Sequence, residues 1–233
     1  FFFTPKTAYA IRLSLVGSEM CIRDRSMAKP STQDEKRLIR FARYLLDKSR
    51  HQIVFKYQAN FDGIAYAVNT WSDTDFAGCK STRKSTSGGA IQLGTHTIKT
   101  WSSTQSVIAL SSGEAEYYGL AKAAAQSLGV KAMLSDFGVN HPVSISVRSD
   151  STAAISIARR RGFGNVRHIE VNQLWLQERV AKREIRLVKV PGTTNAADHL
   201  TKPGCTAALK QHMDITHQRI VQGRHDNQLR VAA

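Results

Sequence analysis

The feature that most limits how this chain can fold is an aspartate at the end of an alternating apolar run. Ile64, Tyr66 and Val68 alternate with smaller or polar residues, and this period of two predicts a strand with at least one buried face. The run passes into a loop around Asp73. A carboxylate at a strand end is fixed by the sheet yet reaches open space, which suits a metal ligand. A lone SDTD motif more often caps a turn, so the assignment depends on three later carboxylates.

The second carboxylate, Glu116, lies on a predicted helix. Ser111 and Glu114 have the spacing of a capping box, and the run that follows is rich in good helix formers. A carboxylate on a buried helix face is unfavourable unless it is paired or bound to a metal, so Glu116 is predicted to point at the sheet. Glu114 has an ordinary role at the helix start. The face that Glu116 shares is small or apolar and comprises Gly119, Leu120, Ala123, Ala124 and Ser127.

Two further aspartates follow predicted strands. An alternating run over residues 143–147 leads to Asp150, and a short helix is expected directly after it. The last strand is expected over residues 184–190. A helix is then predicted from Asn195, with Asp198 one turn into it. Each of the four carboxylates is therefore predicted to lie close to an end of a strand or helix.

A hairpin and a further helix complete the predicted elements. Residues 90–93 and 97–102 flank the turn at 94–96, a pattern typical of two antiparallel strands. A mostly apolar helix is expected over residues 166–182. Its Trp175 is more typical of a core residue than of a platform that stacks a base.

The two ends of the chain are predicted to lie outside the main domain. Residues 1–26 do not form a convincing signal peptide, and SLVGSEMCIRDR is similar to translated sequencing-adapter read-through, so this segment is interpreted as non-native. Apolar residues at helical spacing predict an amphipathic helix that ends near Asp47. From residue 204 the pattern dissolves, and residues 204–233 are predicted to form an irregular tail.

The charge of the chain indicates a polyanionic partner. The formal net charge is +15, of which residues 1–26 contribute +2, which leaves +13 for the remainder. Neutralising phosphates releases counterions and favours association, although charge alone does not separate nucleic acid from an acidic membrane. No run approaches the roughly 18 apolar residues of a membrane span. The three cysteines have no metal-ligand spacing, so reduced thiols in an intracellular setting are expected.

Two basic loops are the candidate phosphate contacts. The loop CKSTRKSTSGG follows Gly78, and three consecutive arginines precede Gly162. Such loops suit phosphate contact, and they are as consistent with solvated turns. The candidate nucleic-acid-binding residues are Lys80, Arg83, Lys84, Ser85, Thr86, Ser112, Arg159, Arg160 and Arg161.

The order of the predicted elements and of the carboxylates resembles that of ribonuclease H. More closely, the motifs SDTDFAG, STRKSTSGG, ALSSGEAEY, RSDSTAAI, RHIE and VPGTTNAADHLTKP resemble the ribonuclease H domain of copia-type retrotransposon Pol polyproteins, which follows the reverse transcriptase. The resemblance spans residues 64–203, and residues 27–63 are similar to the tail of the reverse transcriptase. It implies an α/β, ribonuclease H-like fold, with a five-stranded mixed sheet and helices on both faces.

The resemblance also implies an activity, endonucleolytic hydrolysis of the RNA strand of RNA/DNA hybrids during reverse transcription. It assigns Asp73, Glu116, Asp150 and Asp198 as catalytic residues and as ligands of two Mg²⁺ ions, for which Mn²⁺ is a substitute. Asp73 would bridge both ions, and Asp198 would help to hold the second. Carboxylates without a Cys or His cluster suit such hard ions. The implied partners are the hybrid and the parent reverse transcriptase domain, with no membrane, in cytoplasmic virus-like particles and in the nucleus.

Other functions remain open at this point. A catalytically inactive hybrid-binding module of a decayed element would share the fold and the charge, and a polyprotein linker would need neither site. An integrase-like strand transferase is disfavoured, because integrases place their glutamate last, whereas Glu116 is on the first helix of the domain. The loop PGTTNA also lacks the histidine that many cellular ribonucleases H carry before the last aspartate.

Overall fold

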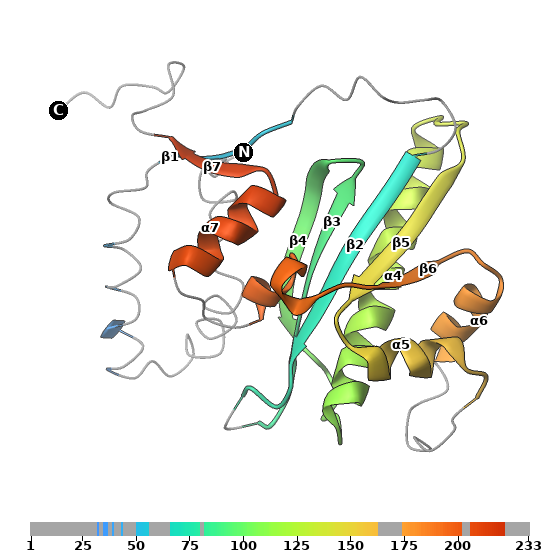
Figure 1. Ribbon diagram of the computed structural model, residues 1–233, viewed down its shortest axis with the longest axis horizontal. Helices are drawn as coiled ribbons and strands as arrows, with labels where there is room; N and C mark the ends of the chain where they lie inside the picture. Colours follow the sequence, from blue (N-terminus) through green and yellow to red (C-terminus); the bar gives the residue numbers. More distant parts are fainter. Residues whose placement is uncertain are drawn as a thin grey trace, which may run out of the picture.

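The fold is organised around a five-stranded mixed sheet, visible at the centre of Figure 1. The computed structural model describes residues 50–55, 66–79, 82–162, 174–201 and 206–221, together with five helical residues between 32 and 43. The strand order is β4-β3-β2-β5-β6, in which β2 pairs antiparallel with β3 and parallel with β5. The strands are β2 (Tyr66–Asp75), β3 (Thr86–Leu93), β4 (His96–Thr104), β5 (Val143–Ser149) and β6 (Arg186–Lys189). The predicted mixed sheet and its hairpin are confirmed.

Helices cover both faces of the sheet, as predicted. Leu120 and Leu176 from the helices on one face pack with Val68 of β2 in the main core, and Trp175 packs against the same core. A second cluster on the other face joins Ala90 of β3 to Leu200, with Ile215 packed against it. The first face carries α4 (Ser112–Asp136), α5 (Thr152–Arg159) and α6 (Trp175–Ala181); the second carries the 3-10 turn η3 (Asp198–Leu200) and α7 (Thr206–Ile215).

Helix α4 lies close to the central strand because a glycine faces that strand. A Cβ atom at Gly119 would lie only 2.5 Å from Thr74 Oγ1 and 3.0 Å from Ser72 Oγ. Farther along the helix, the Oγ atom of Ser127 is 2.7 Å from Thr70 Oγ1. Strand β2 therefore presents small hydroxyl side chains to α4, and this close packing fixes the helix against the end of the strand.

The segment around Asp198 is not an α-helix, so the prediction of a helix from Asn195 is wrong. Two 3-10 turns take its place, η2 (Gly192–Thr194) and η3. Asn195 Oδ1 accepts a hydrogen bond from the backbone N–H of Ala197 at 3.1 Å. Thr201 Oγ1 lies 2.9 Å from the carbonyl oxygen of Asp198. Side chains that bond to nearby backbone groups compete with helical hydrogen bonds, which explains the irregular path.

The prediction of an irregular tail is wrong for residues 206–221. They form α7 and the strand β7 (Gln218–Val221), which pairs antiparallel with β1 (Arg50–Ile53). Gln92 Nε2 of β3 donates a hydrogen bond to the carbonyl oxygen of Ile215 at 2.8 Å, and Thr97 Oγ1 donates to that of Thr216 at 3.0 Å. Strands β3 and β4 therefore hold the end of α7 through side-chain bonds that connect residues far apart in the sequence.

The β1–β7 pair joins segments from both sides of the predicted domain. Arg50 pairs with Val221 and Ile53 with Gln218, so the chain before the five-stranded sheet lies beside the chain after it. The predicted N-terminal segment 1–26 and most of the predicted helix before Asp47 lie outside the described residues, as does the whole segment 163–173. Within the described part of the chain, no helix is long and apolar enough to cross a membrane.

Candidate metal centre and nucleic-acid surface

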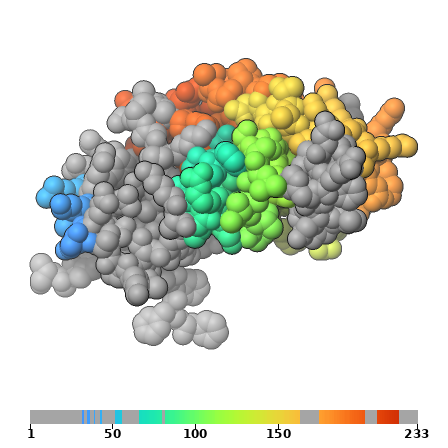
Figure 2. Space-filling view, turned by 90° about the horizontal axis from the view of Figure 1, so that it is seen from below, coloured from blue at the N-terminus to red at the C-terminus, as the bar shows by residue number. Residues whose placement is uncertain are grey.

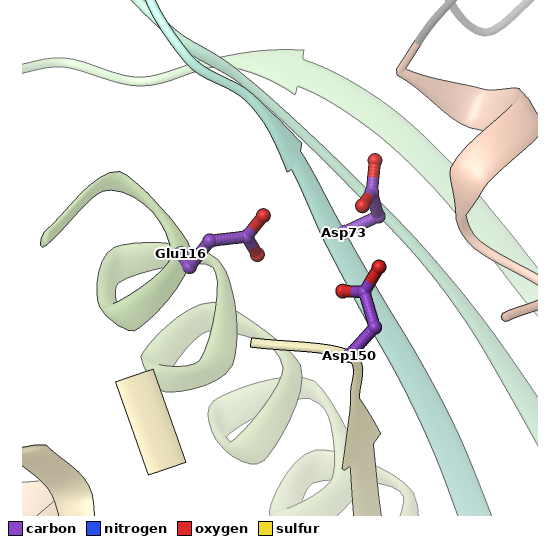
Figure 3. A group of neighbouring side chains, drawn as sticks. All are labelled: Asp73, Glu116 and Asp150. Atoms are coloured by element: carbon purple, nitrogen blue, oxygen red, sulfur yellow. The ribbon is translucent and has the colours of Figure 1, made fainter. Parts of the chain in front are cut away.

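Three of the four predicted carboxylates come together at one end of the sheet. One oxygen from each of Asp73, Glu116 and Asp150 lies within 4.8 Å of the others. Figure 3 shows the three side chains converging from β2, α4 and the end of β5. Asp73 is 1% exposed, and the other two are half-buried. A compact group of oxygen donors, two of them on half-buried side chains, can hold a divalent metal ion.

The two aspartates meet because β2 and β5 are parallel neighbours. Trp71 pairs with Arg148 in the last described step of this ladder, so Asp73 and Asp150 each lie two residues beyond the same rung. After Asp150 the chain turns at once into α5, whose N-cap Ser151 accepts a hydrogen bond from the N–H of Ala154 at 3.2 Å. The strand pairing and the capped helix together hold the Asp150 backbone in place.

The two glutamates of α4 lie in different surroundings, as the helix register predicts. The backbone N–H of Glu114 donates to Ser111 Oγ at 3.2 Å, which caps the helix. The carboxylate of Glu114 is buried and accepts hydrogen bonds from the N–H of Leu110 at 2.9 Å and from the hydroxyl of Tyr118 at 2.7 Å. Glu114 is therefore committed to the helix start, and Glu116 is the glutamate that faces Asp73.

Asp198 is not part of the three-carboxylate group. It lies on η3, where its side chain is 32% exposed and its Oδ2 is 3.9 Å from His199 Nδ1. Helix α7 packs against this turn, and Nδ1 of its buried His212 is 2.9 Å from the carbonyl oxygen of Ala196. The predicted role of Asp198 in holding a second ion stays a prediction.

Thr201 and Asn195, which flank Asp198, form hydrogen bonds to Asp73 and Ser72 of β2. The sequence analysis predicted neither contact. Thr201 Oγ1 donates a hydrogen bond to Asp73 Oδ2. Asn195 Nδ2 donates to the carbonyl oxygen of Ser72 at 3.0 Å. Neither contact has a local signal, because each joins residues more than 120 positions apart.

The predicted nucleic-acid contacts separate into exposed and buried groups. Ser85 and Thr86 are buried, and Ser85 Oγ accepts a hydrogen bond from the N–H of Ala77 at 3.0 Å, so these two hydroxyls do not form surface contacts. Arg159 is exposed and also donates to the carbonyl oxygen of Leu187 at 3.0 Å. Lys80 lies outside the described residues. The remaining candidates are Arg83, Ser112 and Arg161, which are exposed, and Lys84 and Arg160, which are half-buried.

The segments that carry the three carboxylates lie side by side at this end of the sheet. In the space-filling view of Figure 2, atoms of the β2 end and its loop (teal) adjoin those of α4 (green), and the yellow segment of α5 lies beyond them. On α4, burial raises the pKa of the Tyr117 phenol to about 12.

The chain is an α/β protein with the ribonuclease H-like fold. This class is defined by the strand order, by the order of elements along the chain and by the carboxylates at the ends of the two central parallel strands. Two curated proteins are similar to this chain in sequence. The chain is 28% identical over 178 residues to the retrovirus-related Pol polyprotein from transposon RE1 of Arabidopsis thaliana, covering 76% of this chain and 12% of that protein. It is 29% identical over 143 residues to the corresponding polyprotein from transposon TNT 1-94 of Nicotiana tabacum, covering 61% of this chain and 11% of that protein.

The chain is thus a relative of the Pol polyproteins of plant transposons, which confirms the resemblance drawn from its motifs. It spans only 11 to 12% of the length of these two relatives. No family model matches it. Among solved structures, it is similar to the N-terminal RNase H domain of a Mycobacterium tuberculosis protein, with 19% identity, a TM-score of 0.41, and coverage of 57% of this chain and 95% of that one.

Proposed function

We propose that this chain is a ribonuclease H domain that cleaves the RNA strand of RNA/DNA hybrids with the help of two Mg²⁺ ions. The observation that carries the proposal is the group formed by Asp73, Glu116 and Asp150, whose oxygens lie within 4.8 Å of one another at the end of the central strands. Phosphodiester hydrolysis requires stabilisation of an attacking water and of a leaving oxygen, which a pair of metal ions supplies when bound.

The donor set fits Mg²⁺. All three side chains offer carboxylate oxygens, and the group contains no cysteine or histidine, so it favours a hard cation over zinc or copper. Asp73 is almost fully buried and accepts a hydrogen bond from Thr201 Oγ1, and it would be the ligand shared by both ions. Glu116 and Asp150 would complete the first site, and Asp198, on the neighbouring turn, would help to hold the second. Mn²⁺ is the expected substitute.

The proposed substrate follows from the charge and from the relatives. A net charge of +13 outside residues 1–26 favours a polyanion, and the exposed Arg83, Arg159 and Arg161 are available for phosphate contacts. The relatives are Pol polyproteins of transposons, so the proposed partner in the same polyprotein is a reverse transcriptase domain. The proposed place of action is the cytoplasmic virus-like particle and the nucleus. Recognition would use the 2′-hydroxyls and the shape of the hybrid and not its sequence.

The test is cleavage of an RNA/DNA hybrid of defined sequence, with each strand labelled at a different end. We expect Mg²⁺-dependent cleavage of the RNA strand alone, abolished by EDTA, and binding that weakens steeply with salt. Equal cleavage of the DNA strand, or activity that persists in EDTA, would reject the mechanism. Tight binding of the hybrid without cleavage at any Mg²⁺ or Mn²⁺ concentration would instead identify an inactive hybrid-binding module.

A further inference from the structure

Thr201 lies directly against the most buried carboxylate of the site. Its hydroxyl donates a hydrogen bond to Asp73 Oδ2, and the two residues are 3% and 1% exposed. A hydrogen bond to an ionised group is about twice as strong as one between neutral groups. Water has little access to this contact, so the hydroxyl orients the carboxylate without competition from solvent.

The hydroxyl has one proton, and its surroundings direct that proton to Asp73. The other acceptor within reach is the carbonyl oxygen of Asp198, 2.9 Å from Thr201 Oγ1. That oxygen already accepts the backbone N–H of Thr201 at 3.2 Å. The charged carboxylate is also the stronger acceptor of the two. The Asp198 turn is thereby tied to the side chain of Asp73.

A second bond fixes the same turn to the same strand. Asn195 is 2% exposed, and its Nδ2 donates to the carbonyl oxygen of Ser72 at 3.0 Å, just beyond the last described rung between β2 and β5. Asn195 and Thr201 lie three residues before and after Asp198. The turn therefore contacts the backbone of Ser72 on one side and the carboxylate of Asp73 on the other.

The neighbouring strand leaves space for this close approach. Gly88 of β3 is the register partner of Asp73. A Cβ atom at Gly88 would lie 2.7 Å from Thr201 Cγ2 and 2.9 Å from Leu200 Cβ. Only glycine allows η3 to approach closely enough for the Thr201 hydroxyl to reach Asp73.

We infer that Thr201 is a positioning residue that holds the Asp73 carboxylate in the orientation required to bind a divalent cation. The inference rests on the proposed function for its biological meaning, but it concerns cation binding by the protein alone. The Asn195 bond keeps the turn in register, and the Thr201 hydroxyl sets the rotation of the carboxylate. Loss of a hydrogen bond that orients a metal ligand typically weakens metal binding by about 10- to 100-fold.

The test is Mn²⁺ binding to the full chain without nucleic acid, measured by titration calorimetry. Thr201→Val keeps the volume and removes the hydroxyl, and it should weaken Mn²⁺ binding by about 10- to 100-fold. Thr201→Ser keeps the hydroxyl and removes the methyl group near Gly88, and its affinity should stay close to that of the unaltered chain. In an Asp73→Asn background, Thr201→Val should cause no further loss. Thr194→Val is the matched control, because this exposed threonine of η2 bonds only to the carbonyl oxygen of Pro191 among the contacts described.

Several outcomes would overturn the inference. Unchanged Mn²⁺ affinity in Thr201→Val would show that the hydroxyl does not position the carboxylate, and equal losses in the Val and Ser variants would assign the effect to packing of the methyl group. If Thr201→Val fails to fold, Thr201→Ala replaces it with the same expectation. A chain that binds Mn²⁺ but cleaves no hybrid would reject the proposed function, while the affinities of the variants would still decide the role of Thr201.

Discussion

Glu116 and Asp198 approach the end of β2 from opposite faces of the sheet, one on the 25-residue helix α4 and the other on the three-residue turn η3. Helix α4 has its own capping box, a full ladder of backbone hydrogen bonds and a buried face against β2. Turn η3 has little regular structure and is held by the side-chain bonds of Asn195 and Thr201 and by α7. The comparison shows that one side of the site is encoded locally and the other by long-range contacts.

The largest effect on hybrid cleavage is expected from a substitution on the α4 side. Glu116→Gln should leave the melting temperature nearly unchanged and lower hybrid cleavage at saturating Mg²⁺ by about 100-fold or more, because a neutral amide is a poor substitute for an anionic ligand. Single-turnover cleavage of labelled hybrid and a thermal melt measure the two quantities. Normal cleavage by this variant would mean that the helix register places another residue at the metal.

Deletion of the C-terminal elements should destabilise the η3 side. A chain that ends at residue 204 loses α7, with its buried His212 and Met213, and the contacts of Ile215. We expect a loss of about 3 kcal/mol in the free energy of unfolding, from buried apolar area and broken hydrogen bonds. Urea denaturation measures it. A chain that ends at residue 221 is the control, because it keeps α7 and β7; equal stability of the two shortened chains would mean that these elements contribute nothing.

A smaller effect is expected from Asp198 itself. Its side chain is partly exposed and lies outside the three-carboxylate group, so under the proposed mechanism Asp198→Asn would remove a weaker ligand. Hybrid cleavage should fall by about tenfold at low Mg²⁺ and recover in part as Mg²⁺ is raised, since the remaining site stays intact. A Mg²⁺ titration of the rate distinguishes this from Glu116→Gln, which should not recover. Loss of all activity at every Mg²⁺ concentration would place Asp198 on a par with Glu116.

The smallest effect is expected at Glu114, two positions from Glu116. A glutamine there can accept the hydrogen bond from Leu110 and bond to the Tyr118 hydroxyl, so Glu114→Gln should lose only the favourable charge at the helix start. The free energy of unfolding should fall by about 1 kcal/mol or less, and cleavage should stay within a few-fold of the unaltered chain. A dead Glu114→Gln variant would reverse the roles of the two glutamates.

The elements that sequence reasoning predicted correctly are those with a repeating local signal. The alternation that ends near Asp73 and the capping box at Ser111 specify β2 and the start of α4, and the face shared with Gly119 places Glu116 toward the sheet. The errors share a long-range component, which adds at the Asp198 turn to the local side-chain bonds of Asn195 and Thr201. The turn around Asp198 and the helix α7 are stabilised by contacts with β2 and β3, and a pattern confined to neighbouring residues carries no trace of them.

By itself, the sequence determined the order of the five strands of the main sheet, the positions of the carboxylates near them and the charge that favours a polyanion, because each depends on residue type and short spacing. The tertiary structure alone decided that Asp198 lies on a 3-10 turn, that Thr201 bonds to Asp73 and that β7 pairs with β1. The physical reason is distance along the chain. These contacts join residues more than 120 positions apart, and their hydrogen bonds form only after the sheet has brought the partners together.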